Sequence, residues 1–139
     1  MLGLIVVTHG GVAEELVKAA KKILGEVESL EAISIDWDDD VSDATARVEK
    51  AIKQVDQGEG VLVLTDMFGG TPTNLSLALL EPGRVDIVTG VNLPMLIKFT
   101  NHRDQYALTD AAGHIAEQGR QAIHVASELL ERSTDGEPN

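Results

Sequence analysis

The sequence contains no cysteine and few aromatic residues, and these two shortages exclude several kinds of chemistry. Without cysteine there is no disulfide framework, no thiolate nucleophile and no cysteine-ligated metal. Aromatic residues make up only 3% of the 139 residues, so a hydrophobic core must consist mainly of leucine, valine, isoleucine and alanine. No apolar run reaches the length of a membrane-spanning helix, so no direct membrane insertion is expected.

Basic residues are also scarce, because 11 lysine and arginine residues stand against 23 acidic ones, for a formal net charge of −12. A protein that binds nucleic acid or an anionic membrane needs a basic surface to neutralise phosphates, and this composition disfavours both partners. The acidic excess favours solubility or attraction to a basic partner. The chain enters an apolar strand without a charged-then-apolar leader, so we expect a cytoplasmic location.

Short apolar runs alternate with segments of helical periodicity, which is typical of an α/β domain. The runs predict strands over residues 4–7, 30–35, 61–65 and 85–89. The periodic segments predict helices over residues 12–23, 42–55, 75–80 and 109–118, and a further helix beginning near Pro94. Thr71 is the expected N-cap of the third helix, and Gly119 is the expected stop of the last. Nothing divides the chain, so we expect one domain over residues 1–132 and a disordered polar tail over 133–139.

These elements predict a doubly wound, mostly parallel sheet in the order 2-1-3-4 with helices on both faces. The first and third strands are apolar without interruption, which indicates burial on both faces and a central position. Residues 121–126 fit either a strand or a helix. As a strand, this segment would lie at an edge of the sheet.

His9 and Asp66 follow the two strands that we place at the centre of the sheet. Parallel strands bring their carboxyl ends to one edge, where open α/β sheets bind ligands. We therefore expect these residues, 57 positions apart, to lie together. A carboxylate that accepts a hydrogen bond from one imidazole nitrogen fixes the tautomer and leaves the other nitrogen as a nucleophile.

The segments around this pair are suited to a phosphoryl group. One helix should begin near Gly11 and another near Thr71, and helix N-termini present free N–H groups to anions. We expect Gly10 to be among the residues that contact the phosphoryl group. Thr71 and Thr73 add hydroxyl donors. No serine or cysteine stands in a nucleophile's position, and no Walker-type loop is present. The pattern predicts that His9 itself accepts a phosphoryl group.

Simpler interpretations exist for each of these residues alone. A single histidine at a strand end is commonly structural or solvent-exposed, an aspartate can cap a turn, and glycines can serve backbone geometry only. Together, at one predicted crevice, the residues favour the functional interpretation. The other histidines lack the spacing of metal ligands, and the acidic loop lacks the glycine and closing glutamate of a calcium loop, so we expect no metal or cofactor. These residues are His102, His114 and His124, and Asp36, Asp38, Asp39 and Asp40.

Three runs resemble the mannose-type enzyme IIA domains of the bacterial sugar phosphotransferase system. They are Val-Thr-His-Gly at 7–10, Leu-Thr-Asp-Met-Phe-Gly-Gly-Thr-Pro-Thr-Asn at 64–74 and Gly-Val-Asn-Leu-Pro-Met-Leu at 90–96. The resemblance covers residues 2–126, and the middle motif is long and specific. The phosphocarrier subunit of dihydroxyacetone kinase, a related branch, lacks the Phe-Gly-Gly-Thr-Pro character and fits less well.

The resemblance implies that His9 takes a phosphoryl group from the histidine-containing phosphocarrier protein and passes it to a IIB component. Asp66 would orient and stabilise the imidazole, and Gly69, Gly70 and Thr71 would line the phosphate position. The resemblance also implies a homodimer that exchanges a C-terminal strand, for which 121–126 is the candidate. Because the chain shows no Ala/Pro-rich linker to a IIB domain, we expect IIB to be on a separate chain or absent.

Other functions share the same crevice and stay open. The phosphorylation state of His9 could control a partner without any role in transport. A small-ligand or nucleotide-binding module would bind its ligand without needing His9. A histidine phosphatase is disfavoured because no arginine accompanies His9 to hold a phosphate.

Overall fold

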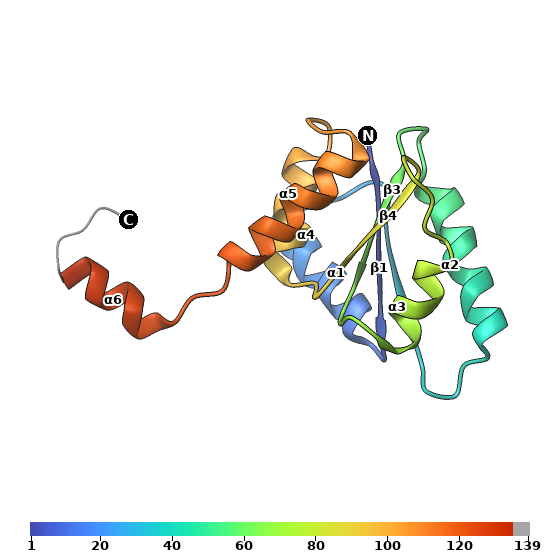
Figure 1. Cartoon of the computed structure of the whole chain (residues 1–139), viewed down its shortest axis with the longest axis horizontal. Helices are drawn as coiled ribbons and strands as arrows, with labels where there is room; N and C mark the ends of the chain where they lie inside the picture. The colour runs from blue at the N-terminus through green and yellow to red at the C-terminus, as the bar shows by residue number, and fades with distance from the viewer. Residues whose placement is uncertain (135–139) are drawn as a thin grey trace.

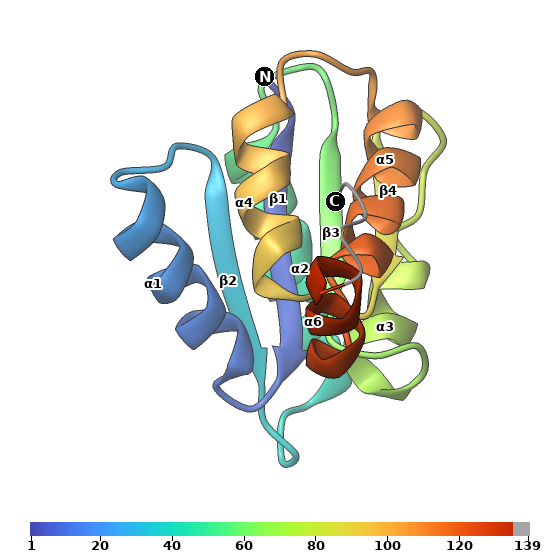
Figure 2. The ribbon, with the colours of Figure 1, turned by 90° about the vertical axis from the view of Figure 1, so that its left-hand side faces the viewer.

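The computed structural model describes residues 1–134 and the side chains of residues 1–131. A parallel sheet in the order β2-β1-β3-β4 forms the centre of the protein, which confirms the predicted order. Figure 2 shows the strands in this order across the sheet. The four strands are β1 (Gly3–His9), β2 (Leu30–Ile35), β3 (Val61–Thr65) and β4 (Val85–Thr89).

Helices cover both faces of the sheet, as predicted (Figure 1). On one face α1, α4 and α5 pack against a core that includes Leu4 and Val6 of β1. On the other face α2 and α3 cover Ile5 and Val7 of the same strand. The helices are α1 (Val12–Leu24), α2 (Val41–Val55), α3 (Gly70–Leu77), α4 (Leu93–His102), α5 (Leu108–Gln121) and α6 (Ala126–Thr134).

The central strands are apolar over residues 4–7 and 61–64 because successive side chains enter opposite cores. Residues 4–7 of β1 and 61–64 of β3 have no exposed surface. The pairing of Val7 with Thr65 then brings the residues that follow both strands to one edge of the sheet. The two fully buried central strands therefore position the predicted site.

At the opposite end of the sheet, Arg103 links the start of the chain to the connection between α1 and β2. It is 5% exposed, and its guanidinium donates to the carbonyls of Leu2 (2.6 and 2.8 Å), Glu28 (2.8 Å) and Ser29 (2.9 Å). Burial lowers the pKa of this guanidinium, and nearby Asp104 and Glu28 oppose the shift. The ring of Phe99 lies 5.5 Å away and covers the cation.

The C-terminal segment differs from the prediction. Residues 121–126 form no edge strand: α5 continues to Gln121, a short connection follows, and α6 begins at Ala126. Gly119 does not end α5, which continues to Gln121. A glycine stands at this position because α5 packs closely on Met95: a Cβ at position 119 would lie 2.6 Å from the Met95 Sδ. A glycine required by tight helix packing looks like a stop signal in the sequence.

The beginning of α3 was also predicted at the wrong residue. The helix starts at Gly70 with Gly69 as its N-cap, so Thr71 lies inside the first turn and does not cap it. The positive φ of Gly69, 90°, lets the chain turn directly from β3 into the helix. At the other end of the chain, α6 includes positions 133 and 134 of the expected tail, and 135–139 lie outside the described residues.

Candidate active site

His9 and Asp66 form the predicted pair at the carboxyl ends of β1 and β3. The Nδ1 atom of His9 lies 2.8 Å from Oδ2 of Asp66, and the backbone N–H of His9 donates to the same oxygen at 3.0 Å. The other carboxylate oxygen accepts from the N–H of Met67 at 3.1 Å. Both side chains are about one-fifth exposed, at 19% and 20%. Three hydrogen bonds thus hold the carboxylate and the imidazole in fixed orientations.

The hydrogen bond between Nδ1 of His9 and Asp66 determines which nitrogen of the imidazole is reactive. A carboxylate only accepts hydrogen bonds, so Nδ1 carries the proton when it bonds to Asp66. In the neutral ring Nε2 then has a free lone pair. The Asp66 carboxylate also balances positive charge that the ring gains when Nε2 forms a new bond.

Gly70 lies directly against the reactive edge of the imidazole. A Cβ at this position would stand 2.8 Å from both Cε1 and Nε2 of His9, and the φ of Gly70 is +80°. Both observations require glycine here. As the first residue of α3, Gly70 also brings the free N–H groups of the helix N-terminus next to Nε2.

The two threonines expected near a phosphate occupy different environments. Thr71 is exposed in the first turn of α3. Thr73 is fully buried; its hydroxyl is 2.8 Å from that of Thr65 and donates to the carbonyl of Met67. The Thr73 hydroxyl is therefore engaged inside the turn by Thr65 and Met67, and its predicted phosphate contact gains no support.

Gly10 follows His9 with a φ of +51°, and a Cβ at this position would meet open space. Its N–H already donates to the carbonyl of Ile35 at 2.9 Å, so this amide is not free to bind a phosphate. Gly10 instead continues the β1–β2 ladder by one residue and turns the chain towards α1.

Two residues near the site were not identified from the sequence. The Thr8 hydroxyl accepts from the N–H of Ala13 at 2.7 Å, which anchors the start of α1 beside His9. The indole of Trp37 lies 5.1 Å from the imidazole, measured between ring centroids, with 33° between the ring planes. The register that pairs His9 with Ile35 could have placed Trp37, two positions beyond Ile35, near the site.

Two of the remaining histidines contact each other. The rings of His102 and His114 are 6.3 Å apart, and Tyr106 stacks on His114 at 4.9 Å. Within residues 1–131 no three histidine, aspartate or glutamate side chains gather as a metal site would require. In the acidic loop, Asp39 pairs with Arg47 at 3.4 Å.

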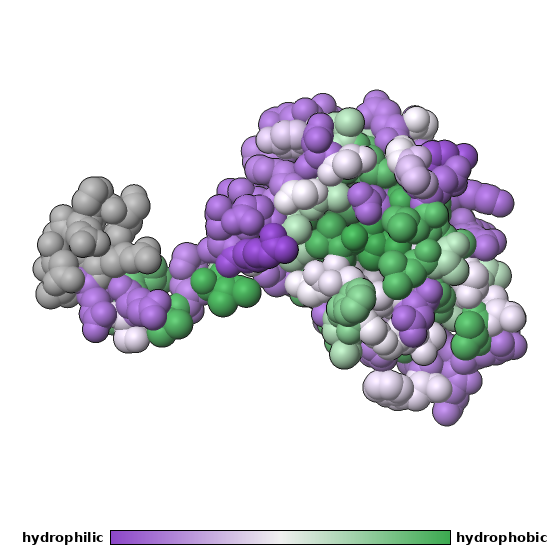
Figure 3. All heavy atoms as spheres, viewed as in Figure 1, coloured by the Kyte–Doolittle hydropathy of each residue, from purple (hydrophilic) through white to green (hydrophobic). Residues whose placement is uncertain are grey.

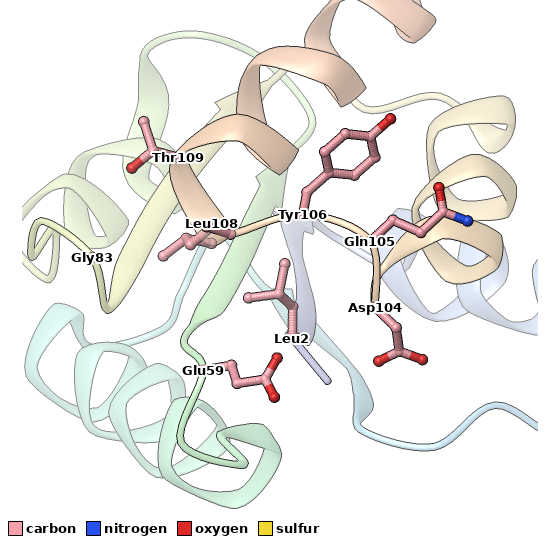
Figure 4. A pocket seen from close by; sticks show the side chains of 9 residues that line it. Leu2, Glu59, Gly83, Asp104, Gln105, Tyr106, Leu108 and Thr109 are labelled. Atoms are coloured by element: carbon pink, nitrogen blue, oxygen red, sulfur yellow. The ribbon is translucent and has the colours of Figure 1, made fainter.

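A cavity of about 510 Å³ lies at the amino ends of the strands, opposite His9 (Figure 4). Its acidic side chains, Glu59 and Asp104, lie 3.4 and 3.9 Å from the terminal ammonium of Met1. The terminal ammonium thus already serves as the positive partner of both carboxylates. The cavity and the His9–Asp66 pair lie at opposite ends of the sheet, so the cavity takes no part in the predicted phosphoryl transfer.

The sequence matches the family described as PTS system fructose IIA component over residues 3–116, where PTS denotes the phosphotransferase system. The chain belongs to this family. A IIA component transfers phosphoryl groups, so the protein has a role in a sugar phosphotransferase system. The matched residues include β1, β3 and the turn into α3, and therefore both members of the His9–Asp66 pair.

Individual relatives of this IIA chain agree with the family match. It is 31% identical over 133 residues to the PTS system fructose-specific EIIA component of Bacillus subtilis, covering 95% of this chain and 91% of the relative. It is 30% identical over 124 residues to the mannose-specific EIIAB component of Escherichia coli, covering 88% of this chain and 38% of that protein. The chain thus matches just over a third of the length of that EIIAB protein.

The fold agrees with a solved structure as well. The phosphotransferase system component EIIA from Streptococcus agalactiae superposes with a TM-score of 0.83 at 24% identity, over 92% of this chain and 99% of that one. In the part of this IIA chain that the structure describes, no helix combines the length and apolar character needed to cross a bilayer.

Proposed function

We propose that the protein is a cytoplasmic phosphoryl carrier in which His9 accepts a phosphoryl group from the histidine-containing phosphocarrier protein and donates it to a IIB component on a separate chain. The observation that carries this proposal is the 2.8 Å contact between Nδ1 of His9 and Oδ2 of Asp66. It leaves Nε2 as the nucleophile at the surface of a family member whose IIA relatives belong to the phosphotransferase system.

In the accepting step, the Nε2 lone pair attacks the phosphorus of a phosphohistidine on the donor. The donor's P–N bond breaks, and its electron pair returns to the donor imidazole. The His9 ring becomes positively charged, and Asp66 stabilises that charge through the Nδ1–H bond. The donating step to IIB is the same reaction in reverse, with the IIB nucleophile attacking phosphorus.

The beginning of α3 supplies the expected contacts to the phosphoryl oxygens. The N–H groups of Gly70 and Thr71 belong to the first turn of the helix, where no preceding carbonyl of the helix can accept them. Gly69 permits the turn that presents them, and the Thr71 hydroxyl is exposed at the same end. Thr73 stabilises this turn from within.

The surface around His9 fits successive docking of two protein partners. Met67 and Phe68 follow Asp66 and are 53% and 77% exposed. Exposed apolar side chains beside a reactive group favour protein contact over binding of a small polar ligand. The net charge of −12 favours partners whose docking surfaces are basic.

We also propose a homodimer, supported by an unpaired edge of the sheet. Within the described residues β4 has no strand on its outer side, and Figure 3 shows apolar side chains gathered over β4 and α3. Beyond α5 the chain leads to α6, which projects from the domain (Figure 1), and Ile123 and Val125 of the connection are 75% and 55% exposed. In the proposed dimer this segment covers the β4 edge of a second copy.

Phosphoryl transfer is tested with purified protein, phosphoenolpyruvate, enzyme I and the phosphocarrier protein. We expect label on the wild type, no label on His9→Ala, and passage of label to a IIB component. An unlabelled wild type would refute the proposal. Label that is accepted but reaches no IIB component would instead support a regulatory role, in which phosphorylated His9 controls a partner.

A further inference from the structure

Trp37 is the only tryptophan of the chain, and its indole lies against the ring of His9. The centroid distance is 5.1 Å and the planes are tilted by 33°. At 84% exposure, Trp37 leaves a large apolar surface in water. The core therefore gains little from this side chain, and its position next to His9 calls for another explanation.

The loop that carries Trp37 is held in place by several interactions. The carboxylate of Asp39 accepts from the N–H of Asp36 at 2.9 Å, and the N–H of Asp39 donates to the carbonyl of Asp36 at 3.1 Å. Arg47 of α2 pairs with the Asp39 carboxylate at 3.4 Å and donates to the carbonyl of Ser34 at 3.2 Å. This closed turn fixes Trp37 near His9 although its side chain is exposed.

The contact completes the enclosure of the imidazole. Asp66 holds the Nδ1 edge, and Gly70 lies against the Nε2 and Cε1 edge. Trp37 adds a contact between two aromatic rings, with 5.1 Å between their centroids and a tilt of 33°.

We infer that Trp37 is a positioning residue for the chemistry of His9, acting in two ways. It restrains the imidazole in the orientation that bonds to Asp66, and it shields the phosphorylated ring from water. The loss that it opposes is hydrolysis: water attacks phosphorus, the Nε2–P bond breaks with its electron pair on Nε2, and both water protons leave with the phosphate. This inference rests on the proposed function, because the shielded group is phosphohistidine.

Hydrolysis without any partner protein isolates this role from docking. His9 is phosphorylated with phosphoramidate, whose P–N bond transfers its phosphoryl group to Nε2 and releases ammonia. The half-life of phosphate on the His9 peptide is then followed by mass spectrometry. We expect Trp37→Ala to shorten it about threefold to tenfold, as loss of one aromatic contact implies. Trp37→Phe, which keeps a ring, should restore most of the half-life.

Tyr106→Ala is the matched control. Tyr106 stacks on His114 at 4.9 Å and lines the cavity at the amino ends of the strands, opposite His9. This variant should keep the wild-type half-life. A second readout is the nitrogen NMR spectrum of His9, which should show the Nδ1–H tautomer in the wild type and Trp37→Phe, and a mixture of tautomers in Trp37→Ala.

A wild-type half-life in Trp37→Ala, or a half-life in Trp37→Phe as short as in Trp37→Ala, would overturn the inference. Neither result bears on the proposed function, which fails only if the phosphocarrier protein does not label the wild type. Conversely, a wild type that the phosphocarrier protein does not label can still be phosphorylated by phosphoramidate, so the two failures are distinguishable.

Discussion

Gly70 approaches His9 so closely that a Cβ at position 70 would lie 2.8 Å from both Cε1 and Nε2 of the imidazole. A real Cβ does not approach backbone or ring atoms this closely, so Gly70→Ala must displace the ring or the start of α3. The left-handed φ of +80° adds backbone strain. We expect the variant to lose at least about 90% of its rate of phosphorylation, because small displacements of reacting atoms are costly. Label incorporation from the phosphocarrier protein measures it, with Gly113→Ala, at an open position, as the control.

Asp66→Asn keeps the size of the side chain but changes its hydrogen bonding. The amide NH₂ group can donate to Nδ1, which moves the ring proton to Nε2 and removes the nucleophilic lone pair. We expect phosphorylation to slow by about 100-fold or more, with the circular dichroism spectrum of the wild type retained. Unchanged transfer kinetics would show that Asp66 serves only the turn.

Thr71 and Thr73 form a matched pair because the same substitution should act on different properties. Thr73→Val removes a buried hydroxyl that bonds to Thr65 and Met67, and we expect the free energy of unfolding to fall by about 1–3 kcal/mol. Thr71→Val changes an exposed position and should leave stability within about 0.5 kcal/mol while slowing phosphorylation. Urea denaturation and label incorporation separate the two effects. Equal stabilities of both variants would contradict the role of Thr73.

Arg103→Met replaces a buried guanidinium with a side chain of similar length that cannot donate. The carbonyls of Leu2, Glu28 and Ser29 then lose a partner. We expect a loss of about 3 kcal/mol in the free energy of unfolding, measured by urea denaturation. Arg120→Met provides the control, because that side chain is 73% exposed and its ion pair with Glu117 is on the surface.

Asp56 should contribute stability only above acid pH. The N–H of Gly58, which donates at 2.8 Å, is the main cause that lowers the pKa of this carboxyl, with help from Gly60 and Arg84. A carboxyl whose pKa is lower in the folded state stabilises the fold above its unfolded value of about 3.9, and this contribution is lost as pH falls through the folded value. We expect Asp56→Asn to cost about 1 kcal/mol at pH 7 and almost nothing near pH 2. Thermal melts at both pH values test this, and an equal cost at both would show that charge is not involved.

The order of the sheet and the meeting of His9 with Asp66 could be predicted from local patterns. Uninterrupted apolar runs indicate strands buried on two faces, and such strands lie at the centre of a parallel sheet. Parallel pairing then brings their carboxyl ends to the same edge, so residues that follow two neighbouring strands lie together. These conclusions depend on periodicity and chain direction, which are properties of the sequence.

The details that set the chemistry depend on contacts between distant segments. Gly119 looks like a helix stop but is buried against Met95, and Thr73 looks like an exposed hydroxyl but bonds to Thr65 inside the turn. The position of Trp37 over His9 depends on the register between β1 and β2 and on a turn held by Arg47. Packing decides each of these, because a side chain's environment is made by residues from other elements. The sequence alone thus determined that His9 and Asp66 meet, and only the tertiary structure decided which other residues surround them and which atoms remain free to react.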